Sequence, residues 1–179
     1  MSIDRTTPYD AMIADAMRRH LGAWDWRWLK AQIFQESKFD PNVVNPRSGA
    51  KGLAQFMDPT WGDMLVNVPG MPKTATPFEA RWAIEAAAWY MAKLRSIWRA
   101  DRSEDDRRRL AQASYNAGIG NVARAQREAK GALGYTAIIA CLPKVTGDDN
   151  AAETRLYVAQ IERWYGQLLA YEGDEHASR

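Results

Sequence analysis

Apolar residues recur at helical spacing in one segment of the chain after another, whereas no segment shows the apolar-polar alternation of a half-buried strand. In residues 24–37, Trp26, Leu29 and Ile33 are three and four positions apart, which places them on one helix face. The last face of this kind comprises Tyr157, Ile161, Trp164 and Leu168. The sequence therefore predicts an all-α fold.

Helix-start and helix-stop signals set the expected limits of these helices. A Thr or Ser followed three positions later by an acidic residue is a capping pattern, and it occurs at residues 76–79 and 103–106. Gly22 and Gly118 stand where helices are expected to stop. We expect helices over residues 8–21, 24–37, 52–64, 77–97, 103–118 and 150–168.

Glu36 continues the apolar face of residues 24–37, because it follows Ile33 by three positions. Burial disfavours a charged carboxylate and raises its pKa, so a Glu placed here can stay protonated near neutral pH and donate a proton. A general acid needs that property. The alternative is a Glu at the helix edge with its carboxylate in water, since buried Glu is rare.

Four sequence blocks give Glu36 a context. They are ESKFDP at residues 36–41, GAKGLAQFM at 49–57, SYNAGIG at 114–120 and ETRLYV at 153–158. In this order they resemble the motifs of the soluble lytic transglycosylase family, whose catalytic domain is similar to goose-type lysozyme. The resemblance covers about residues 24–168, and it implies one lysozyme-like globular domain with a substrate cleft over residues 1–179.

The resemblance also implies roles for particular residues. It makes Glu36 the catalytic acid/base. It places a group of polar and aromatic residues around the sugar substrate, namely Ser37, Gln55, Met57, Tyr115, Asn116, Glu153 and Tyr157. Residue chemistry alone leaves other roles open: Glu153 fits a helix cap, residues 116–120 fit a helix stop, and Gln55 and Met57 fit a cap and a core filler.

The activity implied by the resemblance is cleavage of the β-1,4 bond between N-acetylmuramic acid and N-acetylglucosamine in peptidoglycan, with formation of a 1,6-anhydro ring. Most glycosidases need two carboxyl groups, but the four blocks supply only one well-placed acid. Two alternatives remain. One is a hydrolytic, goose-type-like lysozyme in which Asp40, Asp58 or Asp63 positions water; the other is a non-catalytic peptidoglycan-binding virion module.

Composition narrows the possible partners. A net charge of +2 without a clustered basic face predicts no nucleic-acid binding. With two His residues and the single Cys141, the chain lacks the closely spaced ligands of a zinc site, so we expect no metal and no cofactor. The eight Trp residues are expected mainly in the core, with Trp61 as the best candidate for the cleft.

The N-terminal residues 1–8 contain no apolar run like that of a signal peptide, and no stretch is apolar enough to insert into a membrane. We therefore expect synthesis in the cytoplasm without a signal peptide. Action on the cell wall would then follow host lysis or delivery by a particle, as for a phage endolysin. We expect the protein to be a monomer.

Overall fold

The computed structural model describes the backbone of residues 2–177 and the side chains of residues 2–171. Within these residues the regular structure is helical, and β-structure is limited to isolated bridges that pair Lys51 with Val44 and with Phe56. The prediction of an all-α fold is confirmed. No helix in this part of the chain combines the length and the apolar composition that crossing a membrane requires.

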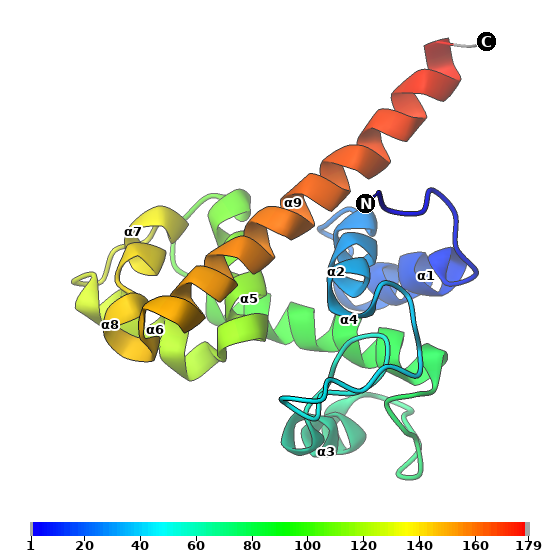
Figure 1. Ribbon diagram of the computed structural model, residues 1–179, viewed down its shortest axis with the longest axis horizontal. Coiled ribbons are helices and arrows are strands. Elements are labelled where there is room, and N and C mark those ends of the chain that lie inside the picture. The colour runs from blue at the N-terminus through cyan, green and yellow to red at the C-terminus, as the bar shows by residue number, and fades with distance from the viewer. Residues whose placement is uncertain (1, 178–179) are drawn as a thin grey trace. The chain divides into compact units, whose positions relative to one another are not determined.

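Figure 1 shows the order of the helices. Their bounds are α1 Asp10–His20, α2 Arg27–Ser37, α3 Asp58–Asn67, α4 Ala80–Ile97, α5 Glu104–Ala117, α6 Ile119–Glu128, α7 Tyr135–Ala140, α8 Pro143–Thr146 and α9 Asp148–Ala177. The contacts within the chain divide it into two compact units. Unit 1 is Met1–Tyr90 with Ile161–Arg179, and unit 2 is Met91–Gln160. The prediction of a single domain with a substrate cleft stays a prediction.

In unit 1, α1 packs against α2, and a buried lysine fixes the N-terminal segment to this pair. The Lys30 side chain on α2 is fully buried, and its Nζ donates to the Arg5 carbonyl at 2.7 Å and to Asp10 Oδ2 at 2.8 Å. Asp10 also accepts hydrogen bonds from the backbone and the hydroxyl of Thr7. Since a buried charge is costly without a partner, this network holds the start of α1 in place.

A second charged cluster joins α1 to α4 within unit 1. Glu85 of α4 accepts hydrogen bonds from Arg19 Nη2 at 2.5 Å, and its other oxygen lies 2.6 Å from His20 Nε2. Burial by itself would raise the pKa of Glu85, but the hydrogen bonds and charges of Arg19 and His20 outweigh burial and hold it below the ordinary value of 4.5. The two helices are therefore linked by an ionised carboxylate.

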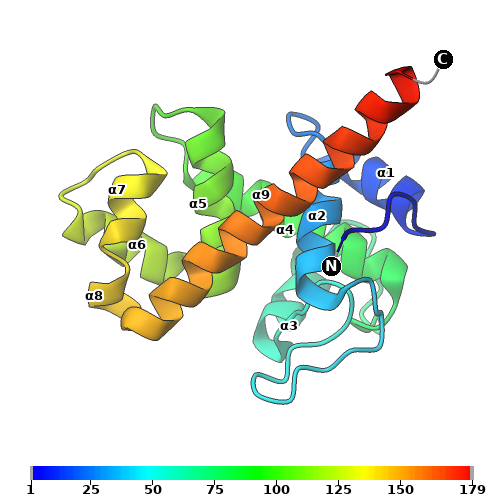
Figure 2. The same cartoon turned by 45° about the horizontal axis from the view of Figure 1, so that its top comes forward.

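The segment between α2 and α3 is an irregular loop, drawn in cyan in Figure 2. Lys51 exchanges backbone hydrogen bonds with Phe56, and the turn between them contains two residues with positive φ, Gly52 at 71° and Gln55 at 49°. A Cβ on Gly52 would lie 1.9 Å from the Pro77 carbonyl oxygen. Only glycine fits this approach of two backbone segments.

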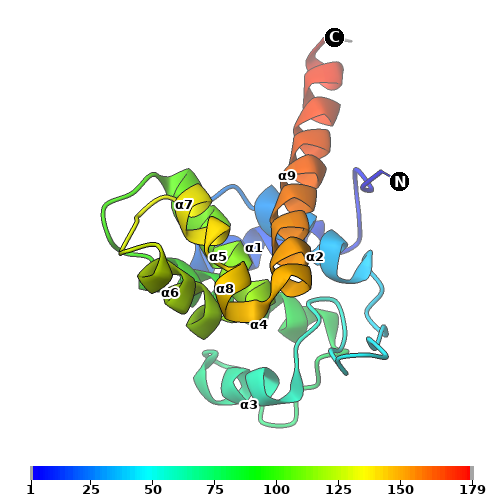
Figure 3. The same cartoon turned by 60° about the vertical axis from the view of Figure 1, so that its left-hand side comes forward.

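Unit 2 is built around α6, which packs against α5, α7 and α8 (Figure 3). Its core includes the fully buried Leu110, Val122, Ile138 and Leu142. Asp106 of α5 accepts a hydrogen bond from the Tyr135 N–H at 2.7 Å, which fixes the start of α7. That bond, although opposed by desolvation, is the main reason that the pKa of Asp106 lies below its ordinary value.

The helix limits agree with the sequence predictions in some places and differ in others. The Ser103 cap is confirmed, because Ser103 Oγ accepts from the Asp106 N–H at 3.0 Å and α5 ends before Gly118. The helix expected over residues 52–64 was wrong in its limits, since α3 begins at Asp58. Similarly, α2 begins three residues later than expected, and the sequence reading missed α6, α7 and α8.

Gly52→Ala should destabilise the protein far more than Gly49→Ala. Both glycines have φ near 70°, so alanine is strained at either position by about 1 kcal/mol, but nothing lies within 4 Å of a Cβ built on Gly49. The backbone clash at Gly52 adds to that strain, and we expect a total loss of about 3–4 kcal/mol. Urea denaturation of the two variants measures the difference; equal losses would contradict the close approach to Pro77.

Glu85→Gln should reduce the acid sensitivity of the protein. Because the pKa of folded Glu85 is lowered, its stabilising contribution is present above pH 4.5 and is lost as the pH falls through the folded value. Denaturation measured between about pH 7 and pH 3 should therefore show a shallower loss of stability in Glu85→Gln than in the unmodified protein. The exposed Glu128→Gln is the control, and an unchanged pH dependence in Glu85→Gln would contradict the linkage.

Candidate active site

Glu36 lies in the last turn of α2, where it is half-buried. Leu29 and Ile33, on the same face, are buried, so the apolar face predicted from the sequence leads up to this carboxylate. Glu36 has an interaction partner within the structure. Its negative charge also acts on Lys38, where it favours the charged ammonium form and so a higher pKa. Ser37 is buried, and its hydroxyl donates to the Ile33 carbonyl at 3.2 Å.

The chain leaves α2 through two consecutive residues in the left-handed region, Lys38 at φ 54° and Phe39 at φ 65°. Lys38 Nζ donates to the Phe34 carbonyl at 2.8 Å, and it lies 4.5 Å from the centre of the Phe34 ring. Burial lowers the pKa of Lys38, and the negative charge of Glu36 opposes that shift. A cation thus closes the C-terminus of the helix that carries Glu36, where the helix dipole favours positive charge.

Within unit 1, a residue of α9 also supports the end of α2. Trp164 Nε1 donates to Gln35 Oε1 at 3.0 Å, and the Trp164 indole meets the Phe34 ring edge-on at 5.1 Å between centroids. The residue before Glu36 is therefore fixed by a long-range hydrogen bond. Such support keeps the position of a functional side chain reproducible.

The second block contributes one exposed side chain and one structural one. Met57 is 42% exposed at the N-cap of α3, so its thioether is available to a ligand. The Gln55 amide donates to the carbonyls of Val43 and Gly52, which braces the loop. The expectation that Trp61 lies in the cleft was wrong, because its indole is buried and donates to the Ala75 carbonyl at 3.0 Å.

In unit 2, Tyr115 and Asn116 occupy the last turn of α5, and both are half-buried. Asn116 Oδ1 accepts a hydrogen bond from Thr154 Oγ1 of α9 at 2.8 Å, so the amide NH₂ of Asn116 is directed away from that contact. On α9, Glu153 is exposed and Tyr157 is buried. Asn116 and Glu153 are thus presented to solvent from neighbouring helices.

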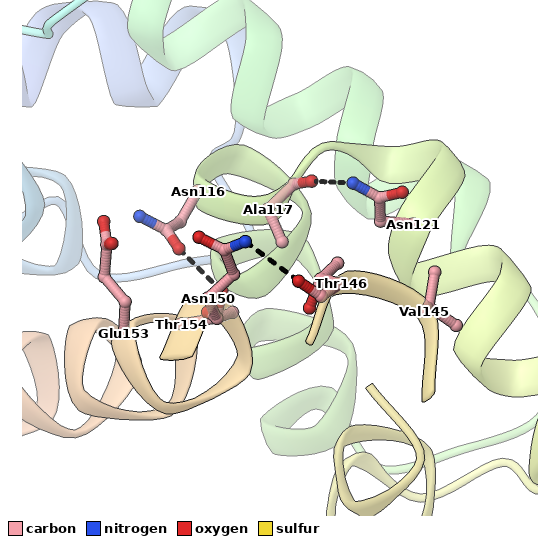
Figure 4. Close-up of a pocket in the computed structure, with 8 residues that line it drawn as sticks. All are labelled: Asn116, Ala117, Asn121, Val145, Thr146, Asn150, Glu153 and Thr154. Carbon is pink, nitrogen blue, oxygen red and sulfur yellow. Dashed lines mark hydrogen bonds between the residues drawn. The ribbon is translucent and has the colours of Figure 1, made fainter. Parts of the chain in front are cut away.

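Figure 4 shows the pocket that these two residues share, with Glu153 on α9 and the Asn116 amide on the same side of it. Its cavity volume is about 270 Å³. Its walls are formed by Asn116, Ala117, Asn121, Val145, Thr146, Asn150, Glu153 and Thr154. Hydroxyl and amide groups dominate the lining, and no basic side chain is among these residues, so the pocket suits a neutral polar ligand such as a sugar.

Sequence reasoning missed Asn121, Val145, Thr146 and Asn150 as pocket residues. The last helix was expected to begin at Asn150, but α9 begins at Asp148, and the Asn150 side chain donates to the Thr146 carbonyl at 2.9 Å. Asn150, three positions before the fourth block, was the available signal. That Glu36, Ser37, Gln55 and Met57 of unit 1 serve one site with Tyr115, Asn116, Glu153 and Tyr157 of unit 2 stays a prediction.

The described residues contain no group of three or more His, Cys, Asp or Glu side chains placed to hold a metal ion. The candidate site residues themselves carry carboxylate, amide, hydroxyl and aromatic groups. Those groups are suited to proton transfer and to sugar binding.

Comparison with known proteins adds three findings. A family model, Transglycosylase SLT domain, matches residues 16–138. Two relatives share the name membrane-bound lytic murein transglycosylase F: that of Desulfosudis oleivorans is 39% identical over 128 residues, covering 70% of this chain, and that of Marinobacter nauticus is 30% identical over 180 residues, covering 93%. The alignments span only 25% and 34% of those proteins.

A solved structure has the same fold. The crystal structure of the 70 kDa soluble lytic transglycosylase from Escherichia coli superposes with a TM-score of 0.66 at 23% identity, covering 89% of this chain and 24% of that one. The expected lysozyme-like fold of the lytic transglycosylases is thereby confirmed. The family resemblance read from the four blocks is confirmed as well.

Thr154→Val should weaken unit 2 by about 1–2 kcal/mol, because it removes the hydroxyl that contacts Asn116 Oδ1 at 2.8 Å and the Asn150 carbonyl at 3.0 Å, while the shape of the side chain is kept. Thr154 is buried, so water does not replace the lost hydroxyl easily. Chemical denaturation measures the loss, with the exposed Thr136→Val as the control. A loss no larger than that of Thr136→Val would show that the contacts of the Thr154 hydroxyl with Asn116 and Asn150 contribute nothing.

Proposed function

Because the chain belongs to the transglycosylase SLT domain family, we propose that it is a peptidoglycan lytic transglycosylase. It cleaves the β-1,4 bond between N-acetylmuramic acid and N-acetylglucosamine and forms 1,6-anhydro-N-acetylmuramic acid. The observation that carries the proposal is Glu36, a half-buried carboxyl group at the end of a buried helix, inside the segment that the family model matches.

In the proposed mechanism, Glu36 acts first as an acid and then as a base. Its carboxyl proton goes to the glycosidic oxygen as the bond to C1 of the muramic acid breaks. The 2-acetamido oxygen of the same sugar stabilises the positive charge at C1. The Glu36 carboxylate then takes the proton from the C6 hydroxyl, whose oxygen bonds to C1. Glu36 ends protonated, as it began, and no water is consumed.

The surroundings of the nearby carboxylates support a mechanism with a single acid. Asp40, Asp58 and Asp63 are all exposed. Asp40 accepts the Asn42 N–H at 2.9 Å within the loop, and Asp58 pairs with Lys51 at 2.5 Å. A carboxylate that positions water in a glycosidase has to be held in place by its surroundings, whereas the partners of Asp40 and Asp58 are exposed contacts close in sequence.

We assign sugar binding to the polar and exposed residues of the remaining blocks. Met57 offers an exposed apolar surface, and the Asn116 amide and the Glu153 carboxylate offer a donor and an acceptor on one pocket wall. Tyr157 and Ser37 are buried, so their proposed part is to support the helices that carry Glu153 and Glu36. In this proposal, neutral and acidic side chains bind the polymer substrate.

Glu36→Gln should lower the rate of peptidoglycan solubilisation by at least about a hundredfold, because an amide cannot donate or accept the transferred proton. Release of soluble muropeptides from purified sacculi measures the rate. Glu128→Gln makes the same chemical change at an exposed position of α6 and should retain full activity. Near-normal release by a folded Glu36→Gln would remove Glu36 from the mechanism.

Digestion in ¹⁸O-labelled water separates this proposal from a hydrolytic lysozyme. A transglycosylase places no label at the muramic acid end, whereas a hydrolase labels its reducing end. Binding to sacculi without any soluble product would instead identify a peptidoglycan-binding module.

We further propose that the protein reaches the wall after host lysis or by delivery on a particle, as a phage endolysin does. The proposed substrate supports a delivery step, since peptidoglycan lies outside the cytoplasmic membrane. Fractionation of producing cells before and after lysis tests this route, and finding the protein in the wall of intact, uninfected cells would contradict it.

A further inference from the structure

Unit 1 contains a cavity of about 470 Å³, separate from the pocket at Asn116 and Glu153. It is formed by α1, the start of α4 and the turn at Pro69 and Gly70. That volume lies within the range of small-ligand sites. None of the residues that line it is among the site residues inferred from the sequence. The cavity therefore has no part in the mechanism described above.

Most of the charges in this cavity are already paired. Arg19 and His20 bind the two oxygens of Glu85, and Asp15 pairs with Arg18 at 2.6 Å. The Glu85 contacts join α1 to α4, whereas the pair of Asp15 and Arg18 lies within α1. The carboxylates of Asp15 and Glu85 both line the cavity.

Arg81 is different. Its side chain is exposed and makes no ion pair or hydrogen bond with the described residues, and its guanidinium lies 4.7 Å from the centre of the Trp82 ring. Stacking on an aromatic ring orients a guanidinium while its N–H donors stay available. Arg81 thus offers a preorganised fork for a carboxylate at the mouth of the cavity.

The remaining wall is apolar. The half-buried Trp82 indole, Met12 and Pro69 provide contact surface next to the Arg81 guanidinium. A ligand that fits has a carboxylate for Arg81, an apolar portion for this wall, and an amine or amide that tolerates Asp15 and Glu85. Because Asp15 and Glu85 already have partners, Arg81 is the charge that the lining offers to a ligand. One such charge suits a single carboxylate better than the repeated phosphates of a polyanion such as a teichoic acid.

We propose that this cavity, the Arg81–Trp82 pocket, binds the stem peptide of peptidoglycan. A stem peptide combines carboxylates, short apolar side chains and, when it contains a diamino acid, a free amine. This inference rests on the proposed function, because it takes peptidoglycan as the substrate. Arg81 is the specificity residue of the pocket, and the peptide and the glycan are held by different parts of the chain.

Calorimetric titration with a free stem tetrapeptide that contains meso-diaminopimelate tests the proposal without any glycan. Arg81→Ala should weaken binding about tenfold or more, the usual effect of losing a charge-assisted hydrogen bond, and Arg81→Lys should recover part of the loss. Arg127→Ala is the matched control, since it removes the same charge from an exposed position on α6 and should leave the affinity unchanged.

No binding of the tetrapeptide, equal affinity in Arg81→Ala, or stronger binding of polyglycerol phosphate would each overturn the proposal. Cleavage of glycan strands freed of peptides is measured in parallel, and the unmodified protein and Arg81→Ala should cleave them equally. If the unmodified protein cleaves no glycan, the proposed function fails while the peptide titration still gives its own answer.

Discussion

The burial of α2 is the constraint on which unit 1 depends. Residues 29–34 of this helix are all buried, including the charged Lys30, so the helix is enclosed on nearly every side. Such a helix cannot rotate or slide without exposing apolar surface and breaking the Lys30 bonds to Asp10 and to the Arg5 carbonyl. At its other end, Lys38 and Trp164 fix the last turn. Glu36 is the ionisable group that this rigid support presents.

The sequence predicted the packing faces of the helices better than their ends. Apolar residues that recur at helical spacing are buried because they form the face on which a helix packs, as Ile161 does on α9. Helix ends depend on single local contacts. The Asp25 carboxylate accepts the Arg27 N–H at 3.0 Å, so α2 begins later than its apolar pattern predicts. Gly118 was expected to end a helix, and it does, but α6 begins at the next residue. Positive φ at Gly52 and Gln55 likewise excludes a helix there.

The candidate site was predictable to the extent that its residues lie in the four blocks. Glu36 and Asn116 could be named from the sequence, but the contact of Asn116 with Thr154 joins positions 38 apart and has no local signature. For Trp61 the prediction from sequence position was wrong. Its position beside a block suggested the cleft, whereas its indole donates to Ala75 inside the core. Sequence proximity to a motif does not fix the direction of a side chain, because tertiary packing decides it.

The two binding regions inferred here have different chemistry, and the difference suits a composite polymer. The pocket at Asn116 and Glu153 presents amide, hydroxyl and carboxylate groups, while the Arg81–Trp82 pocket presents a guanidinium that pairs with none of the described residues. We propose that Glu36 alone serves as both acid and base. Mass spectrometry of the muropeptides released by the unmodified protein and by Glu36→Gln tests this mechanism most directly. We expect the unmodified protein to release muramic acid ends that are lighter by one water, as an anhydro ring requires, and Glu36→Gln to release none; ordinary reducing ends, or anhydro ends from Glu36→Gln, would contradict the mechanism.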